Sequence, residues 1–70
     1  MIVEEAYMAK VIYDYEGDSS KNEHTVKSGE IIEVSPASDD WVGGYINNVF
    51  GYIPKQYVVR LDQGMYYWLL

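Results

Sequence analysis

The apolar residues of this chain occur in short runs that are separated by polar, turn-forming segments. Five runs have the length and composition of strands: residues 9–13, 30–34, 41–46, 49–53 and 58–61. They are dominated by β-branched and aromatic residues, which favour extended backbone. No window of about a dozen residues repeats apolar positions at the spacing of an amphipathic helix. The pattern therefore predicts an all-β chain of five short strands.

The segments between the runs predict how the strands are connected. Asn47 and Asn48 separate two runs, and asparagine tolerates the positive φ that a two-residue hairpin turn requires. Pro54 ends the preceding strand, and the three residues after it are enough for a single 3₁₀ turn. Residues 16–27 are polar and predict a long loop, and residues 35–40 predict a shorter one. Five short strands with two such loops favour a small barrel or two orthogonal sheets.

The composition limits the class of protein. Seventy residues make one domain near the lower size limit, and without cysteine there is no disulfide, thiol nucleophile or Cys-based zinc site. The acidic N-terminus does not resemble an export signal. The longest apolar run, residues 65–70, is far shorter than the roughly 20 residues that span a bilayer. We therefore expect a soluble, cytoplasmic domain that uses no cofactor or metal.

Charge and aromatic content indicate the kind of partner. Five Lys and Arg residues against eleven Asp and Glu residues give a formal charge of −6, which disfavours binding to nucleic acid or to anionic membranes and favours a basic partner. Eight tyrosines and two tryptophans exceed what a core of this size can bury, so some rings should form a binding surface. A single histidine, no cysteine and no glycine-rich phosphate loop argue against an enzyme.

Four segments, in this order, resemble the signature of Src-homology 3 (SH3) domains. They are residues 11–15 (VIYDY), 23–30 (EHTVKSGE), 41–42 (WV) and 51–58 (GYIPKQYV). The resemblance covers about residues 8–61. It implies a five-stranded SH3-type barrel of two orthogonal antiparallel sheets with one 3₁₀ turn.

The resemblance also divides the chain into three parts. Residues 8–61 form the SH3 domain, residues 1–7 are an N-terminal extension, and residues 62–70 are an apolar C-terminal tail. The tail is either an unstructured end or a segment that docks on the barrel or on another copy of the chain. In the last case the chain would self-associate through residues 65–70.

SH3 domains bind proline-rich segments in the polyproline II conformation, commonly with a flanking Arg or Lys. That helix has three residues per turn and no internal hydrogen bonds, so its prolines fit slots between aromatic rings and its carbonyls accept from the domain. Each ring could instead be a half-buried barrel residue. The resemblance assigns the peptide-binding role to Tyr13, Tyr15, Trp41, Tyr52, Pro54 and Tyr57.

A third pocket of the family selects the basic residue of the ligand. A guanidinium that lies over the Trp41 ring and bonds to Glu23 would combine a cation–π contact with a charge-assisted hydrogen bond. Each acid of the two loops could equally be a solvated loop residue. The candidate specificity acids are Glu16, Asp18, Glu23, Asp39 and Asp40.

Two residues depart from the family pattern. His24 stands where an apolar residue normally points into the barrel, and Val11 stands where alanine is usual. Because Gly44 lies in a strand that should pack nearby, we expect the larger Val11 to fill the space that Gly44 leaves. The function implied is that of a non-catalytic adaptor, scaffold, cytoskeletal or signalling module. The alternative is an SH3-like barrel whose groove is unused and which acts through intramolecular regulation or self-association.

Overall fold

The computed structural model describes residues 6–61, so the predictions for residues 1–5 and 62–70 lie outside the described part of the chain. The described residues form five strands and two 3₁₀ turns, and no helix among them has the length and apolar character needed to cross a membrane. The elements are β1 (Tyr7–Val11), η1 (Ser19–Lys21), β2 (Ile31–Pro36), β3 (Trp41–Ile46), β4 (Val49–Pro54), η2 (Lys55–Tyr57) and β5 (Val58–Arg60).

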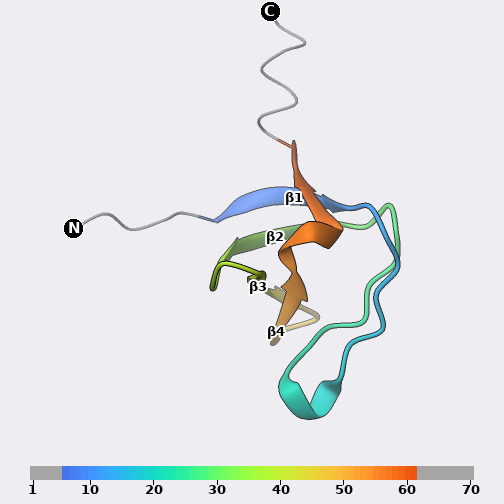
Figure 1. Cartoon of the computed structure of the whole chain (residues 1–70), viewed down its shortest axis with the longest axis vertical. Coiled ribbons are helices and arrows are strands. Elements are labelled where there is room, and N and C mark those ends of the chain that lie inside the picture. Colours follow the sequence, from blue (N-terminus) through green and yellow to red (C-terminus); the bar gives the residue numbers. More distant parts are fainter. Residues whose placement is uncertain (1–5, 62–70) are drawn as a thin grey trace, which may run out of the picture.

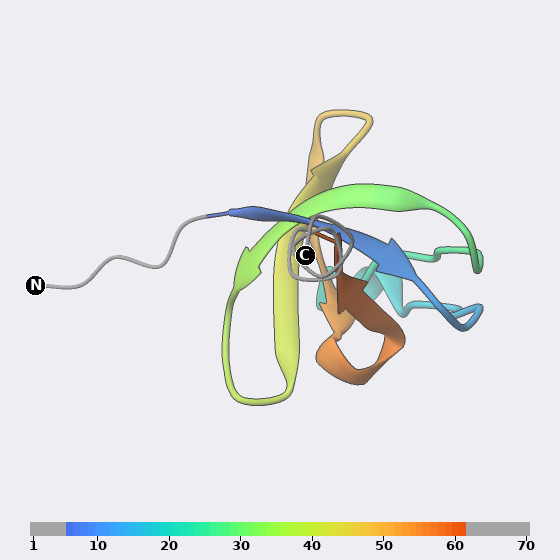
Figure 2. The same cartoon turned by 90° about the horizontal axis from the view of Figure 1, so that it is seen from above.

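The strands pair in the order β4-β3-β2-β1-β5, and every pairing is antiparallel. β2 is strongly curved (Figure 2), which lets it pair with β1 from Ile31 to Val34 and with β3 at Ser35 and Pro36. The bent strand β2 therefore connects the β1–β2–β5 part of the sheet to the β3–β4 hairpin. The all-β prediction is confirmed.

The local signals of the sequence mark most boundaries. Asn47 and Asn48 form the hairpin turn with φ of 52° and 67°, and η2 follows Pro54 as predicted. β1 begins at Tyr7, within the segment that the sequence predicts as an N-terminal extension. A second 3₁₀ turn, η1, lies inside the long loop and was not predicted. It forms because the Asp18 side chain accepts a hydrogen bond from the backbone N–H of Ser20.

The core is small and almost entirely aliphatic. In β1, the inward-facing residues are buried while Met8 and Lys10 face solvent, as the two-residue repeat of a strand requires. The half-buried rings of Tyr7, Tyr15 and Tyr57 pack against the core from outside. The rings of the candidate groove therefore rest on a closely packed base. The fully buried residues are Ala9, Val11, Val26, Val34, Val42 and Ile53.

The long loop is attached to the barrel at two places. At its base, Tyr15 and Val26 exchange two backbone hydrogen bonds of 2.9 Å. Further out, the Tyr52 N–H donates to the Asn22 carbonyl at 2.7 Å and the His24 N–H donates to the Tyr52 carbonyl at 2.9 Å. Figure 1 shows the two arms of the loop running side by side to η1. The loop is therefore held against β4.

His24 fills a notch between β3 and β4. Gly44 and Gly51 lie opposite each other in these strands, and the His24 Nε2 atom is 2.9 Å from the Gly44 carbonyl oxygen. A Cβ added at Gly51 would lie 2.8 Å from that nitrogen, so only glycine leaves room for the ring. The half-buried imidazole thus occupies an inward position, as the resemblance implied for residue 24.

The expected exchange of volume between Val11 and Gly44 is wrong. A Cβ added at Gly44 would overlap the Glu33 carbonyl oxygen and lie 3.3 Å from the Val34 side chain. The reason is the curvature of β2, which brings its backbone, rather than β1, over Gly44.

Candidate aromatic binding groove

Four rings from three separate segments of the chain form a continuous row. The Tyr57 ring centroid lies 5.7 Å from that of Tyr13 and 5.2 Å from that of Tyr15, and the Tyr15 centroid is 6.5 Å from that of Trp41. The interplanar angles of 72° to 77° are those of edge-to-face contacts, a favoured arrangement of aromatic pairs. The row is assembled from the segment after β1, from η2 and from the first residue of β3.

Pro54 lies beside Trp41, next to this row. It is the last residue of β4 and lies directly opposite Trp41 in the β3–β4 pairing. Asp40 and Gln56 join these two residues in lining a hollow of about 210 Å³. Trp41 therefore lines this hollow together with Pro54, while its ring also contacts the Tyr15 ring.

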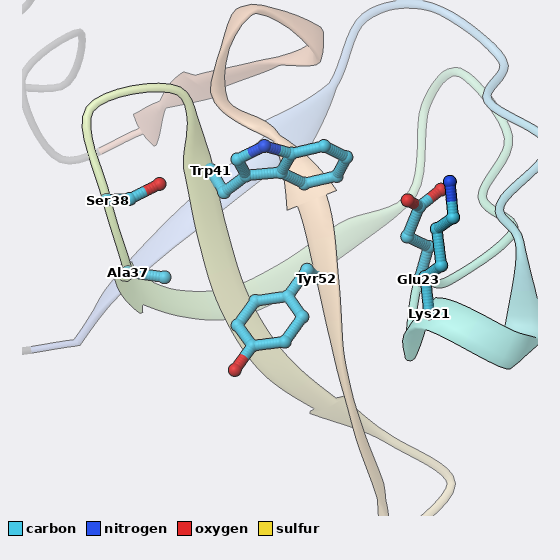
Figure 3. Close-up of a pocket in the computed structure, with 6 residues that line it drawn as sticks. All are labelled: Lys21, Glu23, Ala37, Ser38, Trp41 and Tyr52. Carbon is cyan, nitrogen blue, oxygen red and sulfur yellow. The ribbon is translucent and has the colours of Figure 1, made fainter.

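A second hollow, of about 330 Å³, lies between the two loops, and Trp41 lines it as well. Figure 3 shows the loop that carries Glu23 and the loop that carries Ser38 facing each other across Trp41 and Tyr52. A side chain placed there would contact an indole ring and a carboxylate together. We call this hollow the acidic pocket; its lining residues are Lys21, Glu23, Ala37, Ser38, Trp41 and Tyr52.

Two hydrogen bonds hold the Glu23 carboxylate in place. Its Oε1 atom accepts from the Tyr15 hydroxyl at 2.6 Å and from the Asp18 backbone N–H at 3.1 Å. These bonds stabilise the ionised form and lower the pKa of Glu23. The same contact, with burial and the Glu23 charge, raises the pKa of Tyr15 to about 12. Because both bonds end on Oε1, Oε2 is the oxygen that the described residues leave for a ligand cation.

The other candidate acids lie elsewhere. Asp18 caps η1, since its Oδ1 atom accepts from the Ser20 backbone N–H at 2.9 Å, and it also accepts from the Ser20 hydroxyl at 2.6 Å. Glu16 is exposed on the long loop, and Asp40 lines the hollow beside Pro54. Asp39 lines a third hollow, which Arg60 and Trp41 also line. Of the five acids, only Glu23 lines the acidic pocket.

The sequence did not identify every residue of the site. Lys21 lines the acidic pocket beside Glu23. As a single basic residue in an acidic loop, it carries no sequence pattern that marks it as a site residue. Ala37 and Ser38 line it from the opposite loop, and Gln56 lines the hollow beside Pro54. Small and polar loop residues carry no pattern that would mark them as site residues.

A small all-β barrel that carries an aromatic row beside a pocket is an architecture that protein-interaction domains use. Comparison with known proteins identifies the family within this class. The family model described as "Variant SH3 domain" matches residues 8–60. The chain therefore belongs to the SH3 family, whose members are protein-interaction modules, and the predicted family is confirmed.

Two known proteins show how close the likeness is. The chain is 36% identical over 62 residues to the human SH3 domain-containing protein 19, a match that covers 87% of this chain and 8% of the relative. The C-terminal SH3 domain of myosin IB from Entamoeba histolytica, solved bound to an EhFP10(GEF) peptide, superposes with a TM-score of 0.68 at 28% identity. This match covers 80% of this chain and 93% of that domain, so the SH3-type fold is confirmed.

Removing the Tyr15 hydroxyl should raise the pKa of Glu23. In Tyr15→Phe, Glu23 loses its strongest stabilising contact, so its pKa should move toward the ordinary value of 4.5. In the wild type, Glu23 stabilises the fold above that value, and this contribution is lost as the pH falls through the lowered pKa. An NMR titration of the side-chain carboxyl carbon measures the shift. Tyr13→Phe is the matched control and should leave the titration of Glu23 unchanged; an unchanged titration in Tyr15→Phe would contradict the assigned role of the hydroxyl.

Proposed function

We propose that this chain is a non-catalytic module that binds proline-rich segments in the polyproline II conformation, with a flanking Arg or Lys. Its setting would be an adaptor, scaffold, cytoskeletal or signalling protein of the cytoplasm. The observation that carries the proposal is the position of Trp41, which lines both the hollow beside Pro54 and the acidic pocket. One ligand lying across Trp41 would thus place apolar residues on one side and a cation on the other.

The aromatic row suits the proline-rich part of such a ligand. Tyr13 and Tyr57 wall the first slot, and Tyr57, Tyr15, Trp41 and Pro54 frame the second. The ligand helix has no internal hydrogen bonds, so its carbonyls need donors from the domain. The Tyr15 hydroxyl already donates to Glu23, so we assign the donor role to the Tyr57 hydroxyl and to the Trp41 indole N–H.

The acidic pocket suits the basic residue. A guanidinium between Trp41 and Glu23 would stack on the indole and bond to Glu23 Oε2. Lys21 lines the same pocket, and its positive charge partly offsets the negative charge of Glu23. The overall charge of −6 further favours a basic ligand over nucleic acid or an anionic membrane. Transient complexes of this size bind in the micromolar range, roughly −7 to −8 kcal/mol.

The test is a two-by-two comparison of ligand and protein. A Pro-x-x-Pro-x-Arg peptide and the same peptide with norleucine in place of Arg are titrated by calorimetry into the wild type and into Glu23→Gln. The wild type should prefer the Arg peptide by about fivefold, as expected for a partly exposed ion pair of about 1 kcal/mol. Glu23→Gln should lose most of this preference.

Glu16→Gln provides the matched control. It removes the same charge from the same loop but lies outside the acidic pocket, so it should keep the preference for Arg. Low ionic strength makes the comparison sharpest, because salt screens exposed charges. Failure of the Arg peptide to bind would contradict the proposed function. Equal loss of preference in both variants would contradict the role of Glu23.

A further inference from the structure

A second group of aromatic rings covers the outer face of the β3–β4 hairpin. The Phe50 ring centroid lies 5.2 Å from that of Tyr45 and 5.2 Å from that of Tyr52, with interplanar angles of 67° and 88°. Tyr45 is 70% exposed and Phe50 is 41% exposed. We call Tyr45, Phe50 and Tyr52 the hairpin ladder. None of its rings is needed to close the core, which lies on the other face of the hairpin.

Gly43 fixes the position of the central ring. It lies opposite Tyr52 in the strand pairing, and a Cβ added to it would lie 2.7 Å from the Phe50 Cζ atom. Phe50 therefore leans over Gly43 and occupies the space of the missing side chain, between the two tyrosines. Rings packed against one another in this way lose little freedom on binding, which makes the hairpin ladder a preorganised surface.

The hairpin ladder is continuous with the acidic pocket. Tyr52 belongs to both, because it lines the pocket with Trp41 and Glu23 and its ring contacts Phe50. Residues on the same face of a strand are about 7 Å apart, so the Tyr45–Phe50 pair lies one such step beyond Tyr52. An extended peptide advances about 3.3 Å per residue and would cover this step with two residues.

We propose that the hairpin ladder binds an apolar side chain of the same ligand, two or three residues beyond the basic residue and away from the prolines. The inference rests on the proposed function. A Leu, Met or aromatic side chain suits the surface, since the ladder presents ring faces and edges, and burying such a side chain is favourable. Tyr52 thereby serves two ligand residues, the cation on one side and the apolar residue on the other.

The experiment is a scan with peptides of equal length. Each carries the Pro-x-x-Pro-x-Arg core and four further residues, all serine except for one leucine that is moved from the first to the fourth position. Calorimetry on the wild type should show about a fivefold gain in affinity for leucine at the second or third position, relative to the all-serine peptide.

Variants locate the gain on the surface. Tyr45→Ser and Phe50→Ser should each abolish the gain in affinity and keep the affinity for the all-serine peptide. Because Tyr45 is largely exposed, Tyr45→Ser should retain the fold. Ile31→Ser is the matched control, because Ile31 is 57% exposed and lies on β2 outside the hairpin ladder. It should keep the gain. A gain that persists in Tyr45→Ser would overturn the inference.

The outcomes separate this inference from the function on which it rests. Failure of the all-serine peptide to bind would overturn both. Binding of that peptide with no gain at any position would overturn only the inference. NMR chemical shifts of Tyr45 and Phe50 in the free protein test two other occupants of the hairpin ladder. A change in these shifts on deleting residues 62–70 would assign the hairpin ladder to the chain's own C-terminal segment. A change with protein concentration would assign it to a second copy of the chain. Either change would overturn the inference.

Discussion

Replacing Trp41 by alanine is expected to weaken binding of a Pro-x-x-Pro-x-Arg peptide by at least about 100-fold, or ~2.7 kcal/mol. Trp41 is the one described residue that lines both the hollow beside Pro54 and the acidic pocket. In the proposed complex, its loss would remove a wall of the second proline slot and the ring on which the ligand cation lies. Central tryptophans of this kind dominate the energetics of many interfaces.

The barrel should remain folded in this variant, because Trp41 is only half-buried and is not part of the fully buried core. Calorimetric titration measures the affinity, and a thermal melt checks the fold. Trp41→Phe retains an aromatic wall but lacks the indole N–H, so its affinity should lie between those of the wild type and Trp41→Ala. A loss below tenfold in a folded Trp41→Ala would show that the ligand binds elsewhere.

Replacing Gly44 by valine is expected to destabilise the fold by at least about 3 kcal/mol. The new side chain would overlap the Glu33 carbonyl oxygen, which belongs to the β2 backbone and cannot rotate away as a side chain can. The carbonyl of Gly44 also bonds to the His24 ring, so a shift of this strand would disturb the loop. Domains are stable by only about 0.05–0.15 kcal/mol per residue, so such a loss would remove a large part of the stability of a chain of this length.

Gly43→Ala is the matched control at the adjacent position. Its Cβ would meet the tip of the Phe50 ring, a side chain at the surface that can move, so a smaller loss of about 1 kcal/mol is expected. Urea unfolding followed by circular dichroism measures both variants. An unfolding midpoint of Gly44→Val at or above that of Gly43→Ala would contradict the close approach of β2.

The fold was largely predictable because its signals are local. The β-branched runs marked all five strands, and Asn47 with Asn48 marked the hairpin turn, since positive φ restricts the choice of residue. The unpredicted turn η1 depends on a single side-chain cap by Asp18, which any polar loop of this composition could offer. The partner of Gly44 was mispredicted because it depends on the curvature of β2, a property of the assembled sheet.

The candidate site was predictable only in part. The motif spacing anticipated the aromatic row, and the structure does bring Tyr13, Tyr15, Trp41 and Tyr57 together. The motif spacing did not distinguish among the five candidate acids. Of these acids, only Glu23 lines the acidic pocket. Its position depends on tertiary contacts, including its hydrogen bond to Tyr15, and such contacts leave no local pattern in the sequence.

The attachment of the long loop to β4 has a consequence for solubility. β4 is the terminal strand of the sheet order, and such a strand offers backbone groups on which another chain can assemble into fibrils. Near Tyr52 these groups are already engaged by Asn22 and His24. The segment that carries Glu23, to which we assign ligand selection, thus also blocks part of the edge against templated aggregation. A change that releases this segment would expose the protein to misassembly and, under the proposed function, would also alter what it recognises.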